Sequence, residues 1–275
     1  MIEHLVLSSA GPYGFIHLGV ISQSIDDKLI DMDCIQSICG TSAGAIVGLL
    51  LCLRIPMDAI LDYFIERPFE KWVRPDLPNC IENKGVVPHE CIQELVLPFF
   101  KAYDIPMDLT MEQLYTFNPI ELHIFTTSVR TLELVDITYK SHPTISVLKA
   151  IAMSSSVPFI FTPVEHENEY YIDGALCETC PLITSGDNVF ICMINSRPLE
   201  YDLSSPFQYL QHIFEGIILK HTQSPVPDGK HVVCYNPDKE IGYSIWIDAI
   251  YSKEYRKRYI DIGKKLVKID TITST

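Results

Sequence analysis

The sequence has no apolar run that approaches the roughly 20 residues of a membrane-spanning helix. Its first apolar stretch, residues 5–7, is short and lacks the basic flank and cleavage pattern of a signal peptide. No glycine- and serine-rich linker and no repeat divides the 275 residues. We therefore expect one domain over residues 1–275, and 47% hydrophobic residues are enough to fill its core. We also expect the protein to be soluble and intracellular, at most peripherally associated with a membrane.

Positive charge is scarce, because 21 lysines and arginines stand against 35 aspartates and glutamates, which gives a net charge of −14. This balance argues against a nucleic-acid partner and against general attraction to an anionic membrane. Residues from about 249 to 269 oppose the trend and predict an amphipathic helix, whose basic residues are Lys253, Arg256, Lys257, Arg258, Lys264, Lys265 and Lys268. We expect this helix to dock its apolar stripe on the domain and to show its lysines to water; binding to a membrane surface is the alternative.

Motifs for nucleotide and metal binding are also missing. The sequence has no GxGxxG, no Gly-Lys-Ser/Thr ending, no EF-hand loop and no HExxH. Nine cysteines form an odd set without regular spacing, which indicates buried thiols in a reducing compartment. The lone CxxC of Cys177 and Cys180 has no second pair in register, so we expect no metal and no cofactor.

The most informative motif that is present lies at residues 40–44, which read Gly-Thr-Ser-Ala-Gly. It follows the apolar run 35–39 and opens a helix-like stretch, and a strand, a tight turn with one serine and a helix together make a nucleophile elbow. There the hydroxyl of Ser42 stands at a helix N-terminus, where backbone amides favour negative charge. Gly40 and Gly44 lack the side chains that would keep strand and helix apart. An ordinary strand-to-helix turn is the alternative for this motif alone.

Two further segments support the elbow. Residues 5–14 form an apolar strand that runs into a small-residue loop, and such a loop can turn successive N–H groups toward one point, as an oxyanion hole requires. Residues 150–161 pass through Pro158 into an apolar strand, and Asp173 follows at the end of a further short strand, directly before Gly174.

These three blocks resemble the patatin-like phospholipases, a family of lipid acyl hydrolases that use a Ser-Asp dyad in place of a Ser-His-Asp triad. The blocks match at residues 8–14, 40–44 and 154–175, and the family motifs as a whole cover residues 5–182. The resemblance implies that Ser42 is the nucleophile and Asp173 its base. It also implies an oxyanion hole formed by the backbone of Ala10, Gly11, Tyr13, Gly14 and Ala43.

The loop departs from the family pattern Gly-Gly-Gly-x-Arg/Lys-Gly. The matching residues here are Ser9, Ala10, Gly11, Pro12, Tyr13 and Gly14. Ser9 and Ala10 keep their backbone donors but restrict φ more than glycine does. Because Tyr13 replaces a cation, we expect a weaker oxyanion hole or a different substrate.

The rest of the chain predicts an α/β fold. Helices are expected over residues 56–66, 88–103 and 111–115, and strands over residues 122–127, 132–138, 189–194 and 231–234. Strands interleaved with helices predict a patatin-like three-layer α/β/α sandwich with a mostly parallel central sheet. Trp72, Phe99 and Phe100 lie in a region that lines an acyl pocket, forms a cap or packs in the core, and the sequence does not separate these three.

The predicted activity is hydrolysis of acyl esters of phospholipids or lysophospholipids, with the lipid substrate met at a membrane surface. An acyltransferase and a non-catalytic lipid-binding or regulatory protein are the alternatives. A triad with His212, His221 or His231 is a further alternative, because GxSxG also occurs in α/β-hydrolases. We expect these histidines to be surface or packing residues, and His17 to pack its helix.

Overall fold

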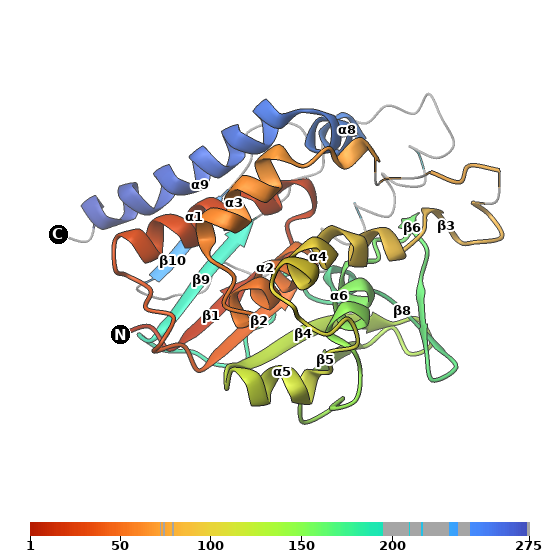
Figure 1. Cartoon of the computed structure of the whole chain (residues 1–275), viewed down its shortest axis with the longest axis horizontal. Helices are drawn as coiled ribbons and strands as arrows, with labels where there is room; N and C mark the ends of the chain where they lie inside the picture. The colour runs from red at the N-terminus through yellow and green to blue at the C-terminus, as the bar shows by residue number, and fades with distance from the viewer. Residues whose placement is uncertain are drawn as a thin grey trace.

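The computed structural model describes residues 1–71, 73, 75–78, 80–194, 209, 216, 231–235 and 243–273 (Figure 1). His212 and His221, considered for a triad, and Trp72, considered for an acyl pocket, lie outside these residues.

In the described part, one sheet of eight strands runs through the molecule in the order β10-β9-β1-β2-β4-β8-β7, with β5 paired to β4. Its strands are β1 (His4–Leu7), β2 (Ser37–Thr41), β4 (Glu121–Ser128), β5 (Leu134–Ile137), β7 (Val164–His166), β8 (Glu169–Asp173), β9 (Val189–Ile194) and β10 (His231–Tyr235). The strands β10, β9, β1, β2 and β4 are parallel, whereas β5, β7 and β8 join antiparallel. The strands predicted over residues 122–127, 132–138, 189–194 and 231–234 are thus confirmed.

The sheet is buried on both faces, as parallel strands require. Every residue of β2 and of β9 is buried. Side chains alternate between the faces: Leu5 and Leu7 join the main core under the helices, and Val6 joins a smaller cluster on the opposite face with Phe125 and Cys180. The core therefore continues through the sheet from one layer to the other.

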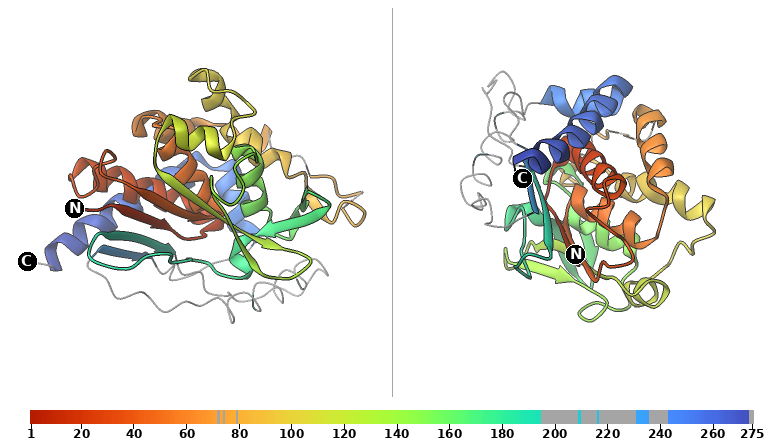
Figure 2. Two further views of the ribbon diagram at one scale, coloured as in Figure 1. Left: turned by 90° about the horizontal axis from the view of Figure 1, so that it is seen from below. Right: turned by 90° about the vertical axis from the view of Figure 1, so that its left-hand side faces the viewer.

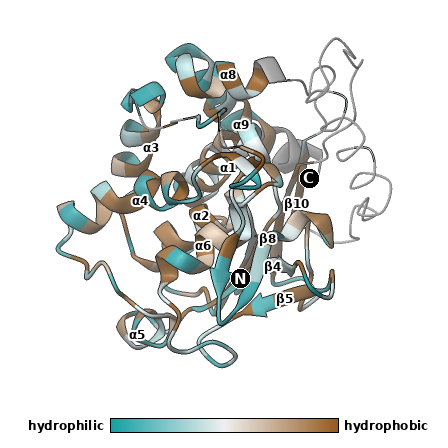
Figure 3. Cartoon of the chain, turned by 90° about the vertical axis from the view of Figure 1, so that its right-hand side faces the viewer, coloured by the Kyte–Doolittle hydropathy of each residue, from teal (hydrophilic) through white to brown (hydrophobic). Residues whose placement is uncertain are grey.

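The helices are α1 (Gly14–Asp26), α2 (Ala43–Cys52), α3 (Met57–Glu66), α4 (Glu90–Ala102), α5 (Met111–Phe117), α6 (Val147–Ser155), α8 (Tyr243–Tyr251) and α9 (Lys253–Thr273). Three short 3-10 turns, η1 (Gly11–Tyr13), η2 (Phe69–Lys71) and η3 (Gly174–Leu176), and the separate strand pair β3 (Gly85–Val87) and β6 (Phe159–Phe161) complete the described part. Figure 3 shows α2 as largely hydrophobic, whereas α3, α4 and α8 alternate hydrophilic and hydrophobic residues as amphipathic helices do. The predicted α/β sandwich with a mostly parallel sheet is confirmed.

The amphipathic segment near residues 249–269 is divided between α8 and α9 at Ser252. The Ser252 hydroxyl accepts a hydrogen bond from the N–H of Tyr255 at 3.0 Å, which starts a new helix there. The helix α9 packs along α1, and both run beside α3 (Figures 1 and 2). The crossing is close, because a Cβ on Gly263 would lie 2.3 Å from the carbonyl oxygen of Ile16.

Arg256 departs from the solvent-facing basic surface expected of this segment. Only 4% of it is exposed, and its guanidinium lies 4.9 Å from the ring centroid of Phe69. It donates hydrogen bonds to four backbone carbonyls, those of Ile65, Arg67, Ala249 and Ile250. Arg256 therefore ties α8 and the end of α3 to α9.

Across the described ranges, no helix combines the length and the apolar character needed to cross a membrane.

Candidate active site

Ser42 lies in a sharp turn between β2 and α2, with backbone angles of φ 54° and ψ −121°. A non-glycine residue rarely adopts this positive φ, and such strain persists only where the surroundings hold it. Gly40 and Gly44 make the turn possible. A Cβ on Gly40 would lie 2.6 Å from backbone atoms of Ala45, and one on Gly44 would lie 2.2 Å from the carbonyl oxygen of Leu7.

A buried serine on α6 holds this turn in place. The N–H of Ser42 donates to Oγ of Ser154 at 2.9 Å, and that hydroxyl donates to the carbonyl oxygen of Phe125 at 2.6 Å. The elbow is thereby bonded to both α6 and β4.

Asp173 ends β8 beside the same turn. Its N–H donates to the carbonyl oxygen of Ser156 at 2.9 Å, and its own carbonyl oxygen accepts from the Thr127 hydroxyl at 2.9 Å. Only 2% of Asp173 is exposed. Its carboxylate accepts a hydrogen bond from the N–H of Ala175 at 2.9 Å and another from the Ser42 side chain. The fold thus brings together two residues that are 131 positions apart in the sequence.

Burial raises the pKa of Asp173 from 3.8 to about 6, and the hydrogen bonds from Ser42 and Ala175 oppose part of that rise. A carboxylate with this pKa is a stronger base than a solvated one and is still mostly ionised at neutral pH. The pair therefore has the arrangement that activates a serine hydroxyl.

The loop that precedes α1 faces the elbow. Gly11 has φ +49° and begins η1. Within this turn the N–H of Tyr13 donates to the carbonyl oxygen of Ala10 at 3.0 Å, and the N–H of Gly14 donates to that of Gly11. The amides of Tyr13 and Gly14, two of the predicted oxyanion donors, are therefore used inside the loop.

The remaining predicted donors are Ala10, Gly11 and Ala43. Gly11 and Ala43 are the first residues of η1 and α2, positions whose N–H groups have no partner within the helix. Gly14 contributes by close packing instead, because a Cβ on it would lie 2.8 Å from Cβ of Ala43.

Tyr13, which replaces the family's cation, points into the core with 1% of its surface exposed. Its ring meets Tyr259 of α9 at a centroid distance of 5.2 Å and Tyr235 of β10 at 6.2 Å, both edge to face. The side chain therefore anchors the loop to the C-terminal part of the described chain.

His17 supports the same loop from α1. Its Nε2 donates to the carbonyl oxygen of Ser8 at 2.8 Å, and Nδ1 lies 3.1 Å from Sγ of Cys192. Complete burial lowers the pKa of His17 to about 4, so the ring is neutral at pH 7. His231 begins β10, at the amino end of the parallel strands, whereas Ser42 follows the carboxyl end of β2. His231 and Ser42 therefore lie at opposite ends of the parallel strands.

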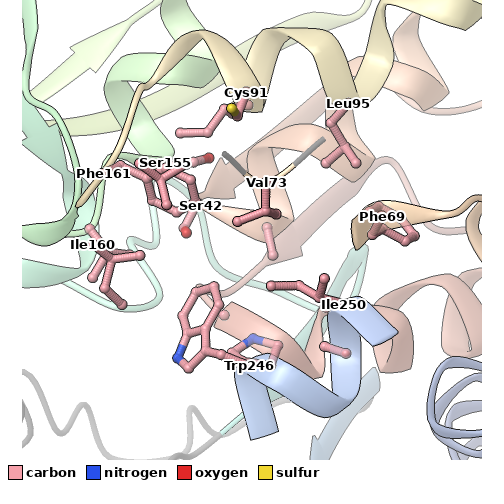
Figure 4. A pocket seen from close by; sticks show the side chains of 18 of the residues that line it. Ser42, Phe69, Val73, Cys91, Leu95, Ser155, Ile160, Phe161, Trp246 and Ile250 are labelled. Atoms are coloured by element: carbon pink, nitrogen blue, oxygen red, sulfur yellow. The ribbon is translucent and has the colours of Figure 1, made fainter. Parts of the chain in front are cut away.

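A cavity of about 620 Å³ opens beside Ser42, within the size range of small-molecule sites. Its walls are largely apolar, and Figure 4 shows Ser42 and Ser155 on one side with Trp246 and Ile250 of α8 across from them. Sequence reasoning missed Trp246. A Cβ on Gly11 would lie 3.4 Å from this indole, so Trp246 closes the cavity next to the loop.

Of the aromatic residues considered for the acyl pocket, Phe99 and Phe100 are buried in the main core and do not line this cavity. No group of three or more histidine, cysteine or acidic side chains in the described part is arranged to hold a metal ion. Cys177 and Cys180 are both free thiols.

Comparisons with known proteins identify the family and the fold. A sequence model of the family described as patatin-like phospholipase matches residues 5–184. The chain is 28% identical over 193 residues to an uncharacterized protein of Acanthamoeba polyphaga mimivirus, an alignment that covers 68% of this chain and 63% of that protein. It is 22% identical over 184 residues to a probable lipid hydrolase of Invertebrate iridescent virus 6. That alignment covers 65% of this chain and 61% of the viral protein. The chain thus aligns with about three fifths of the length of each viral relative.

Two solved structures have a similar fold. VipD from Legionella pneumophila superposes with a TM-score of 0.59 at 15% identity, over 99% of this chain and 67% of that one. The type III effector protein ExoU of Pseudomonas aeruginosa superposes with a TM-score of 0.51 at 12% identity. The superposition covers 98% of this chain and 52% of ExoU. At these identities the likeness concerns the fold alone.

Proposed function

The chain belongs to the patatin-like phospholipase family, and from this premise we propose that it hydrolyses acyl ester bonds of lipids as a phospholipase A or lysophospholipase. Ser42 is the nucleophile and Asp173 the base. The observation that carries the proposal is the elbow that holds Ser42 next to the buried carboxylate of Asp173, whose pKa the Ser42 side chain affects, at the wall of an apolar cavity.

The first half-reaction follows from this arrangement. Asp173 accepts the hydroxyl proton while Ser42 Oγ attacks the ester carbonyl carbon. The resulting oxyanion receives hydrogen bonds from the N–H groups near Gly11 and from that of Ala43. As the intermediate collapses, the protonated Asp173 returns its proton to the leaving alcohol, and the acyl group stays on Ser42.

The second half-reaction reverses these roles. Asp173 deprotonates a water molecule, whose oxygen attacks the acyl carbonyl, and the proton returns to Ser42 as the free fatty acid departs. An acyltransferase would use the same acyl-Ser42 intermediate with an alcohol in place of water, and analysis of the products separates the two activities.

The cavity supports a lipid as the substrate. Leu18, Phe64 and Leu95 are among its apolar lining residues, and apolar surface favours an acyl chain over a polar group. We propose that the acyl chain occupies the cavity while the head group stays toward the membrane surface from which the lipid is taken.

A fluorophosphonate probe with mass-spectrometric mapping tests the proposal. We expect stoichiometric label on Ser42, no label at that position in Ser42→Ala, and strongly slowed labelling in Asp173→Asn, because the hydroxyl then has no base. Ester turnover should be abolished in both variants while their circular dichroism matches the wild type. Asp136→Asn, a carboxylate of β5 that bonds to His123, is the matched control and should label normally.

An unlabelled Ser42, under conditions in which a known serine lipid hydrolase reacts, would instead favour a lipid-binding protein without turnover. The altered loop at Ser9, Ala10 and Tyr13 would then be the feature that distinguishes it from active relatives.

A further inference from the structure

The cavity beside Ser42 is lined by apolar residues up to the surface of the protein. A lining residue that is also exposed lies where the cavity meets solvent. Pro75, Leu77 and Ile247 meet both conditions, and 66% of Leu77 and 40% of Ile247 are exposed. Among the described residues that line the cavity, none is charged. The cavity therefore opens between the loop that precedes β3 and the helix α8, and its exposed lining residues are apolar.

Two more large apolar residues are exposed directly beside lining residues. Ile81, which is 91% exposed, follows Cys80, and Phe159, which is 42% exposed, precedes Ile160. Single exposed apolar residues are ordinary, but a group of them around one opening marks an interaction site. We call this group the apolar rim, which consists of Leu77, Ile81, Phe159 and Ile247.

Backbone hydrogen bonds hold the part of the rim that lies before β3. The N–H of Asp76 donates to the carbonyl oxygen of Val86 at 2.6 Å, and the N–H of Gly85 donates to that of Cys80 at 3.1 Å. These bonds close the loop between η2 and β3, which projects from the right-hand end of the molecule in Figure 1. The exposed side chains of this loop are therefore presented by a bonded turn.

The strand pair β3 and β6 places Phe159 next to this loop. Phe159 of β6 pairs with Gly85 at the start of β3. Its φ is 68°, a value that a bulky residue rarely adopts and that persists only where the surroundings hold it. Backbone strain thus accompanies an exposed aromatic residue at the mouth of the cavity.

The charges beside the rim do not favour an anionic surface. The loop carries Asp76, Glu82 and Lys84, and Asp248 follows Ile247 on α8. The Nζ of Lys84 lies 5.5 Å from the ring centroid of Tyr170. Among these described neighbours negative charges outnumber positive ones, so attraction to a lipid surface comes from burial of apolar side chains and suits zwitterionic head groups.

We propose that the apolar rim inserts into the surface of a zwitterionic phospholipid bilayer and places the cavity mouth against it. This inference rests on the proposed function and names the face with which the protein meets its lipid. A protein partner on the rim would cover the mouth, whereas a bilayer presents acyl chains to it. An acyl chain then enters the cavity without crossing water, which is the costly step for an apolar chain.

Sedimentation with phosphatidylcholine vesicles tests the proposal, in a Ser42→Ala background so that no lipid is consumed. Ile81→Ser should weaken vesicle binding roughly 10-fold, because burial of an isoleucine side chain stabilises the bound state by about that factor. The side chain is exposed in the free protein, so its loss removes no core packing.

Phe117→Ser is the matched control. Phe117 is 65% exposed, but it ends α5, which leads into the amino end of β4, whereas Ser42 follows the carboxyl end of the parallel strand β2. This substitution removes an equally exposed apolar side chain at the other end of the sheet. It should leave vesicle binding within about 2-fold of the parent protein.

Activity gives a second readout. Because Ile81 does not line the cavity, Ile81→Ser with Ser42 intact should keep wild-type kcat/KM on a soluble acyl ester and turn over vesicles more slowly. Equal vesicle binding by the Ile81 and Phe117 variants overturns the inference, and so does a parent protein that does not bind the vesicles. A dimer that forms without lipid and dissociates in Ile81→Ser also overturns it, because the rim would then bind a second copy.

These results differ from those that would remove the proposed function. If Ser42 neither labels nor turns over any ester, the proposed function fails, whatever vesicle binding shows. If Ser42 labels and a soluble ester is hydrolysed while Ile81→Ser binds vesicles as its parent does, the proposed function stands and the inference about the rim fails.

Discussion

At the scale of single residues, the site depends on strain and desolvation that neighbours maintain. Ser42 keeps a left-handed backbone because Ser154 binds its N–H and two glycines let the chains approach. Asp173 keeps its raised pKa because its carboxylate is buried. The positive φ of Ser42 and the burial of the Asp173 carboxylate are each unfavourable by themselves. The surrounding fold maintains both.

The raised pKa of Asp173 predicts the pH dependence of turnover. As the proposed base, Asp173 can act only when ionised, so kcat/KM should be half-maximal near pH 6 and fall about 10-fold per unit below it. His17 titrates well below this range, and its ring does not contact the pair.

Initial rates on a soluble ester between pH 4.5 and 8, with circular dichroism at each pH to exclude unfolding, measure this profile. A rate that stays constant down to pH 4.5 would contradict Asp173 as a buried base.

The candidate residues could be named from the sequence where the signal is local. The GTSAG motif and the Asp-Gly pair placed Ser42 and Asp173 beside each other through the family resemblance. The bonding of the Tyr13 and Gly14 amides was not predictable, because it follows from the φ angle of Gly11. Nor does sequence tell which of the adjacent residues Ser154, Ser155 and Ser156 lines the cavity, since that depends on how α6 is rotated against the sheet.

At the scale of elements, α8 and α9 complete a site whose motifs all lie earlier in the chain. The helix α8 supplies one wall of the cavity, and α9 holds the Tyr13 ring. Arg256 joins these helices to α3 through four carbonyl groups.

Replacing Arg256 by alanine should lower the free energy of unfolding by about 2–4 kcal/mol, because the carbonyls that it satisfies would be left buried without their donor. Arg258→Ala, an exposed arginine two positions along the same helix, should change it by less than about 0.5 kcal/mol. Urea denaturation followed by circular dichroism measures both. Equal stabilities of the two variants would show that the Arg256 contacts contribute little.

The break between α8 and α9 shows why element boundaries are harder to predict than elements. Helical spacing of apolar residues continues through Ser252, so the sequence favoured one helix over about residues 249–269. The structure starts a second helix at Lys253, where the Ser252 side chain caps it. The sequence alone does not distinguish a serine that caps a helix from a serine that lies within one.

At the scale of the whole molecule, net charge and local charge oppose each other. The chain carries −14, yet Lys257 and Lys265 are exposed on α9. We expect the net charge to decide how the protein approaches a charged membrane. At low ionic strength, the electrostatic potential at long range is the sum of the contributions of all charges.

Turnover on vesicles should therefore be several-fold faster with zwitterionic phosphatidylcholine than with anionic phosphatidylglycerol at about 20 mM salt, and the difference should shrink at about 0.5 M salt as screening increases. Initial rates of fatty acid release measure this, with a soluble ester as the control that salt should leave unchanged. Faster turnover on anionic vesicles at low salt would instead assign membrane contact to the basic face of α9.

The overall class was predictable because buried strands alternate with helices along much of the chain. The cavity was not, because its walls come from segments far apart in sequence, such as Ile46 on α2 and Trp246 on α8. Only the packing of α8 against the loop at Gly11 brings them together.

The order of the two paired residues along the chain also bears on how the protein is made. Ser42 leaves the ribosome 131 residues before Asp173, and at about 5–20 residues per second this interval is on the order of 10 s. The elbow of a nascent chain thus emerges before its proposed base, and Trp246 of the cavity wall follows later still. A chain that terminates before β8 would carry Ser42 without the carboxylate that we propose as its base.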